Sequence, residues 1–141
     1  MDAVTLVRKV QDAIETRMYV DRKRTEEIIG AVFSALSVRL TGKEGENLIS
    51  QLPAPLKELW YEKAFVRSID PSLWNEEAVI KLSKEEFVAL IKKEGKLATM
   101  EEAEFAGRCV IHFLKEAISP GEVHDATCQL PSDLKEWVEA A

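Results

Sequence analysis

The sequence predicts an all-α protein, built from two pseudo-symmetric repeats of about four helices each, packed into one compact helical domain. Three observations predict this fold class. Apolar residues recur at spacings of three and four along most of the 141 residues, which is the period of an amphipathic helix. Ser, Thr, Asp, Pro and Gly lie between these stretches, where helices begin and end. Segments of the first half also recur 78 residues later.

The repeat is clearest at the sequence Gln-Leu-Pro, which ends at Pro53 and again at Pro131. At this offset, ten of the 34 positions from Thr25 to Glu58 are identical to their counterparts. Unrelated segments of average composition would share about two. Upstream of Thr25 the offset becomes 81, so the first copy carries a three-residue insertion near residues 18–20.

The first copy, residues 1–63, is expected to contain four helices, over 3–16, 22–40, 42–51 and 55–63. Asp21 is placed to cap the second helix, because a short acceptor side chain there satisfies free N–H groups. Thr41 and Glu44 have the spacing of a capping box for the third helix. Pro53 marks the hinge before the fourth helix.

The second copy, residues 83–141, is expected to contain the matching helices over 84–94, 100–118, 120–129 and 133–140. Ser83 and Thr99 each precede a Glu by three residues, which indicates capping boxes at the first two helices. Ser119 and Glu122 form a third box, with Pro at the first helical position. Ser132 is expected to cap the last helix.

Residues 64–82 form a connector between the copies. The connector is too apolar for a free linker, because it contains Phe65, Ile69, Leu73, Trp74 and Ile80. We therefore expect it to pack on the body of the protein, with Trp74 at least half buried.

Composition excludes several classes of protein. The apolar fraction of 46% is too high for a disordered chain. The net charge of −6 disfavours a nucleic-acid-binding protein, since phosphate backbones are bound by clustered Lys and Arg. No run approaches the roughly 20 apolar residues that span a bilayer, and the N-terminus lacks the pattern of a signal peptide. Two cysteines do not make a disulfide framework. We expect a cytoplasmic protein that binds neither membranes nor nucleic acid.

With these duplicated elements in view, the chain resembles the domain-of-unknown-function 2267 family, small bacterial and archaeal proteins with two helical repeats. The resemblance covers most of the chain and rests on matching elements in both copies. These are the helix ending Leu36-Ser37-Val38-Arg39-Leu40, the box at Thr41, Gln51-Leu52-Pro53, Leu56 and Trp60, then Leu114, Ile118, the box at Ser119, Gln129-Leu130-Pro131 and Leu134. The resemblance implies an all-helical fold and a cytoplasmic setting, and it brings no catalytic residues.

Four residues have a spacing that could bind zinc: Cys109, His112, His124 and Cys128. The two residues of each Cys–His pair lie about one turn apart on the same expected helix, so each pair could bind one metal ion together. Against this, the first copy has Ala31, Ser34, Glu46 and Ser50 at the same positions, so the same unit is built there without a metal. A buried thiol and solvated imidazoles are the simpler interpretation. A metal- or thiol-dependent protein is kept as the alternative function.

Two further features are open to more than one interpretation. The basic run Arg22-Lys23-Arg24 could contact phosphate, although the acidic residues around it favour a solvated surface. Gln51 and Gln129 recur, and we expect them to satisfy backbone groups freed where each Pro ends a helix. The alternative is a polar contact repeated on two related surfaces.

The features that the two copies share are caps, apolar stripes and hinges, all of which serve construction. We therefore predict a non-enzymatic protein–protein interaction or assembly module. No catalytic, cofactor-binding or metal-binding residue is assigned and no cofactor is expected, and the oligomeric state stays open.

Overall fold

A computed structural model describes residues 1–40, 42–68 and 83–141 of the chain. Within these ranges the chain is helical and forms no strand, which confirms the predicted all-α class. The helices are α1 (Ala3–Glu15), α2 (Arg22–Arg39), α3 (Gly42–Ser50), α4 (Ala54–Ser68), α5 (Lys84–Glu94), α6 (Met100–Ala117), α7 (Pro120–Thr127) and α8 (Ser132–Ala140).

The helix boundaries lie close to those predicted, with one clear exception. α4 continues to Ser68, so the first five residues of the expected connector are helical. The predictions for the rest of the connector, including the burial of Trp74, fall outside the described residues. The expected Thr41 box also falls outside them.

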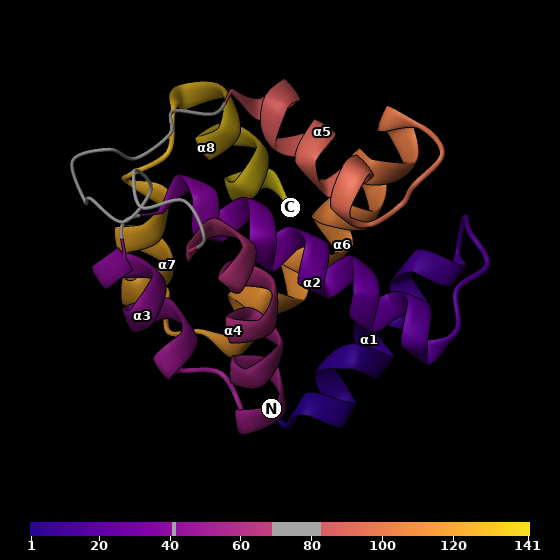
Figure 1. Ribbon diagram of the computed structural model, residues 1–141, viewed down its shortest axis with the longest axis horizontal. Helices are drawn as coiled ribbons and strands as arrows, with labels where there is room; N and C mark the ends of the chain where they lie inside the picture. The colour runs from indigo at the N-terminus through magenta and orange to yellow at the C-terminus, as the bar shows by residue number, and fades with distance from the viewer. Residues whose placement is uncertain (41, 69–82) are drawn as a thin grey trace.

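The two long helices, α2 and α6, form the centre of the molecule. They pack against each other, and α2 also packs on α4 and α5 while α6 packs on α1 and α5. Figure 1 shows α2 across the middle of the view, with α6 behind it and the short helices α3 and α7 together at one end. The core lies along α2 and α6, where Phe33, Ile29 and Val110 are fully buried.

Local capping explains where several helices begin. The side chain of Asp21 accepts a hydrogen bond of 2.7 Å from the N–H of Arg24, as expected for the start of α2. Ser83 forms a complete capping box with Glu86 at the start of α5. The prediction for Ser132 is wrong, because this residue is already helical and Pro131, which has no side-chain acceptor, occupies the cap position.

The end of α5 is a Schellman motif with an unusual residue. The N–H of Leu97 donates to the carbonyl of Lys92 at 2.9 Å, and the N–H of Lys96 donates to that of Lys93 at 3.3 Å. Lys96 has a φ of 53°, in the left-handed region where glycine is usual. Gly95 lies one position earlier, where a Cβ would come within 2.7 Å of the Ile91 carbonyl oxygen and 3.3 Å from the side chain of Ala31 on α2, so a larger residue would force a shift.

Candidate functional site

The two Cys–His pairs lie on separate helices and differ in environment. Cys109 on α6 is half-buried against the core, and burial raises the pKa of its thiol. His112 is exposed, with its Nε2 3.5 Å from Oε1 of Glu116. His124 and Cys128 are both exposed, and the sulfur lies 3.5 Å from Nε2 of the imidazole.

These positions give no support to the metal or thiol alternative. Across residues 1–40, 42–68 and 83–141, no three His, Cys, Asp or Glu side chains are placed to hold one metal ion. A reactive thiol needs a lowered pKa, and burial acts in the opposite direction on Cys109.

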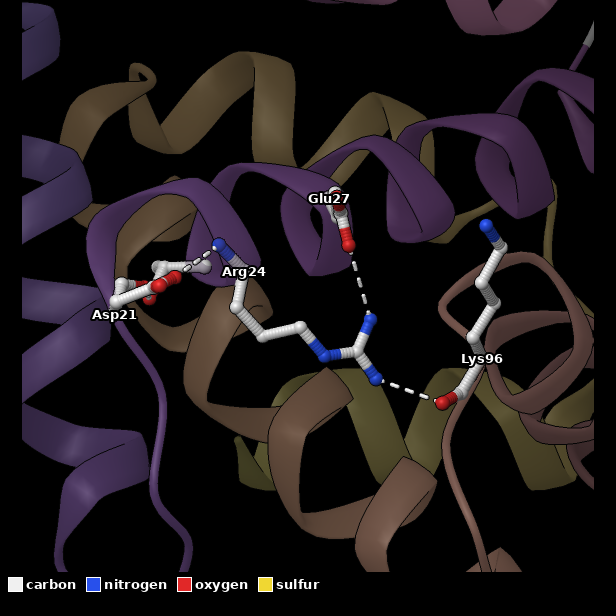
Figure 2. A network of polar contacts seen from close by, with 5 residues as sticks. Asp21, Arg24, Glu27 and Lys96 are labelled. Atoms are coloured by element: carbon white, nitrogen blue, oxygen red, sulfur yellow. Dashed lines mark hydrogen bonds and ion pairs between the residues drawn. The ribbon is translucent and has the colours of Figure 1, made fainter.

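The basic run at the start of α2 is largely engaged within the molecule. Figure 2 shows the guanidinium of Arg24 between Glu27 and the backbone of Lys96. Its Nη1 is 3.2 Å from a carboxylate oxygen of Glu27, and its Nη2 donates to the carbonyl of Lys96 at 2.7 Å. Arg22 pairs with Glu26 at 3.1 Å, one helical turn away. Arg24 therefore joins α2 to the turn that follows α5.

Arg39 is a buried cation that the sequence reasoning did not single out. It lies in the last turn of α2 with 8% of its surface exposed, and desolvation lowers the pKa of its guanidinium. A positive charge at this end of a helix is favoured by the helix dipole.

Both recurring glutamines form hydrogen bonds where α3 and α7 contact each other. The side-chain oxygen of Gln51 accepts a hydrogen bond of 2.7 Å from the N–H of Ser119, at the start of α7. The side-chain amide of Gln129 donates to a carboxylate oxygen of Glu44 on α3 at 3.3 Å. Gln51 thus satisfies a backbone group, as expected, but one in the other half of the chain and not one freed by Pro53.

Glu44 and Glu122 complete this contact. Both residues are buried, with 9% of their surface exposed. Burial raises the pKa of Glu122 to about 7, and the neighbouring carboxyl of Glu44 adds to this through a hydrogen bond and through repulsion. We call Glu44, Gln51, Glu122 and Gln129 the α3–α7 junction.

The capping box predicted at Ser119 is only half formed, because Ser119 also takes part in the α3–α7 junction. The N–H of Glu122 donates to the Ser119 hydroxyl at 3.3 Å, so half of the box is present. The other half requires the N–H of Ser119, which is donated to Gln51. Sequence reasoning missed the junction as a unit, although a signal existed: both its glutamates and both its glutamines are 78 residues apart.

The chemistry available at the junction is proton exchange near neutral pH. A carboxyl with a pKa near 7 can accept or donate a proton at neutral pH, as a general acid or base must. The carboxyls that act on Glu122 are those of Glu44 and Asp125, and Glu44 also accepts a hydrogen bond from the amide of Gln129. We therefore expect the stability of the α3–α7 contact to depend on pH near neutrality.

Comparisons with known proteins place the chain in a family. No helix in the described part of the chain has the length and apolar character needed to cross a bilayer. No curated protein matches the sequence. The family described as uncharacterized conserved protein, DUF2267, matches residues 4–137, nearly the whole chain, and the protein therefore belongs to the DUF2267 family.

Proposed function

We propose that this protein is a non-enzymatic interaction or assembly module, built from two copies of one four-helix unit and working in the cytoplasm. Both cysteines are free thiols, as is usual in a reducing compartment. The duplicated helix caps, apolar stripes and hinges all serve construction, which supports this role.

The packing of the helices supports the duplication. The first helix of each proposed copy packs on the long helix of the other copy, since α1 contacts α6 and α5 contacts α2. The long helices α2 and α6 contact each other, as do the short helices α3 and α7. A two-fold relation between the copies predicts that each such contact recurs in reciprocal form, because equivalent elements then have equivalent neighbours.

The α3–α7 junction supports the same relation at the level of side chains. Glu44 and Glu122 occupy equivalent positions in the two copies and are close neighbours in space. Gln51 and Gln129, also equivalent, each contact the opposite half of the chain. These hydrogen bonds between the two halves support one body built from two copies of the unit.

Tyr19 is the observation that carries the interaction role. This aromatic side chain is 90% exposed, whereas most other aromatic rings in the described part of the chain are at least partly buried. Its loop is held in place, because Val20 is buried and the Gln11 amide donates to the Val20 carbonyl at 3.3 Å. Tyr19 belongs to the insertion found only in the first copy, so construction of the repeat does not need it. Exposed tyrosines on a fixed frame are frequent anchors of protein interfaces.

Site-specific photo-crosslinking tests this proposal. A photoreactive phenylalanine analogue is introduced at Tyr19 in cells, and the control carries it at Tyr61, an exposed tyrosine on α4. We expect protein adducts, with another protein or a second copy of this chain, at position 19 and not at position 61.

Sedimentation velocity of the wild type and Tyr19→Ala measures self-association directly. Absence of adducts at position 19, together with a strict monomer in sedimentation, would contradict the interaction role. Equal adducts at both positions would show that Tyr19 is not the anchor.

A further inference from the structure

An apolar pocket lies between α2, α3, α6, α7 and α8. Its lining includes Leu36, Leu40, Ile111, Leu114, Val123 and Val138. The cavity itself measures about 50 Å³, inside a hollow of about 450 Å³ that includes its partly open mouth.

The polar residues that border the pocket direct their polar atoms elsewhere. The ammonium of Lys115 donates to the carbonyls of Val138, Glu139 and Ala141 at the end of α8, at 2.8–3.0 Å. The hydroxyl of Thr127 donates to the carbonyl of His124 at 3.0 Å. Both residues therefore present carbon atoms to the pocket, and its wall suits a ligand without strong polar groups.

The first copy of the unit has an aromatic ring at the corresponding place. At the offset of 78, Val138 corresponds to Trp60, Ile111 to Phe33 and Val123 to Gly45. The Trp60 and Phe33 rings pack with centroids 5.3 Å apart, and both are buried. Gly45 makes room for the indole, since a Cβ there would lie 3.3 Å from Cζ2 of Trp60.

The second copy also has a tryptophan in its last helix, but one position earlier. Because a helix turns by about 100° per residue, Trp137 projects from another side of α8. Its ring packs edge-on to Phe87, 6.0 Å between centroids, and close to Gly107, where a Cβ would lie 3.1 Å from the indole. No ring of α8 is thus directed to the place that Val138 leaves open.

We propose that this pocket binds one apolar aromatic ring, supplied by a ligand, in the place that Trp60 fills in the first copy. The inference rests on the duplication in the proposed function, because the corresponding positions are defined by it. The ring comes either from a small free aromatic compound or from an aromatic side chain on a polypeptide, and the experiment separates these sources.

The size of the pocket sets the expected mode of binding. An engineered apolar cavity of roughly 150 Å³ takes up benzene, whereas the enclosed part here is smaller. A ring would therefore sit partly in the mouth, as a side chain or a substituent-bearing compound would.

Two probes are titrated into protein labelled on its Ile, Leu and Val methyl groups. Indole represents the free compound, and N-acetyl-tryptophanamide represents a ring on a polypeptide. We expect saturable shifts of the Leu36, Ile111 and Val138 methyl signals with at least one probe. Shifts with indole alone assign the site to a free compound, and shifts with the amide assign it to a side chain.

Val138→Trp restores the first copy's ring and should abolish the saturable shifts while raising the melting temperature. Ala126→Leu introduces the residue that the first copy has at this position, Leu48, and should narrow the pocket and weaken binding. This smaller change keeps the proposal testable if Val138→Trp fails to fold. Glu136→Trp adds an indole on an exposed position of α8 and should leave binding unchanged.

Failure of both probes to shift these methyl signals would overturn the pocket proposal. The interaction role would be unaffected by that result, because Tyr19 lies outside the pocket lining and is tested by its own adducts. Binding that survives in Val138→Trp would also overturn the proposal, since the ring would then occupy another place.

Discussion

The side-chain oxygen of Gln51 accepts a hydrogen bond of 2.7 Å from the backbone N–H of Ser119, 68 residues further along the chain. Gln51 directly follows α3, and Ser119 is the N-cap of α7. The bond therefore fixes the end of one short helix to the start of another. Because Glu44 on α3 also contacts Gln129, the two halves of the chain are joined at this junction by polar bonds from both sides.

Replacing Gln51 by alanine should lower the free energy of unfolding by about 1 kcal/mol, the usual contribution of one hydrogen bond. The change leaves the Ser119 N–H without its acceptor. Urea denaturation followed by circular dichroism measures the loss. Gln51→Glu keeps an acceptor oxygen and adds a negative charge near the N-terminus of α7, which the helix dipole favours. This variant should therefore lose less stability than Gln51→Ala. Equal losses in both variants would show that the bond does not stabilise the fold.

The Glu44–Glu122 pair should make stability fall as pH rises from about 4.5 to about 7. The pKa of Glu122 is raised from 4.5 to about 7 in the folded protein, chiefly by burial and then by Glu44. The folded state therefore holds this proton more tightly than the unfolded state does. Within that window the unfolded state is the one that has lost the proton, so raising the pH favours unfolding. Denaturation in urea at several pH values measures the slope.

Glu122→Gln tests the origin of that slope. The amide resembles the protonated carboxyl in shape and does not titrate, so the variant should lose most of the decrease between pH 4.5 and 7. Glu139→Gln, at an exposed position of α8, should retain it. A slope that survives in Glu122→Gln would assign the effect to another group.

The helices could be predicted from the sequence because their causes are local. Asp21 and Ser83 cap helices through bonds to residues three positions away, and such spacing is visible in a sequence. The end of α4 could not be placed from the sequence, because residues 64–68 contain no Gly or Pro that would stop a helix at residue 63.

The α3–α7 junction could not be predicted in the same way. The partner of Gln51 is Ser119, and sequence spacing gives no distance between residues so far apart. An N–H group donates fully to one acceptor, so the bond from Ser119 to Gln51 displaces the local bond that the capping pattern predicted. The available signal was the 78-residue offset: under the duplication proposed above, equivalent residues that lie near a two-fold axis, as Glu44 and Glu122 would, become neighbours.

Arg24 should matter more to stability than its neighbour Arg22. Arg24 has a side chain only 28% exposed and joins α2 to the turn after α5 through Lys96 (Figure 2). Arg24→Ala should lower the free energy of unfolding by about 1 kcal/mol, because a charged donor to a backbone carbonyl is lost. The side chain of Arg22 is 64% exposed and pairs with a residue of the same helix. Arg22→Ala should therefore lower the free energy of unfolding by only about 0.3 kcal/mol. Similar losses in the two variants would contradict a role for the Lys96 contact.

Lys96→Gly should stabilise the protein by about 0.5–1 kcal/mol. Lys96 has a φ of 53° at the position after the helix cap, where a Cβ is unfavourable and glycine has no penalty. Its side chain is exposed, and its backbone carbonyl, which accepts from Arg24, is kept in the variant. Lys93→Gly is the matched control, because Lys93 is also exposed but helical, and glycine there should destabilise α5 by about 1 kcal/mol. The two variants should therefore shift the urea midpoint in opposite directions, and a destabilised Lys96→Gly protein would show that the left-handed turn carries no strain.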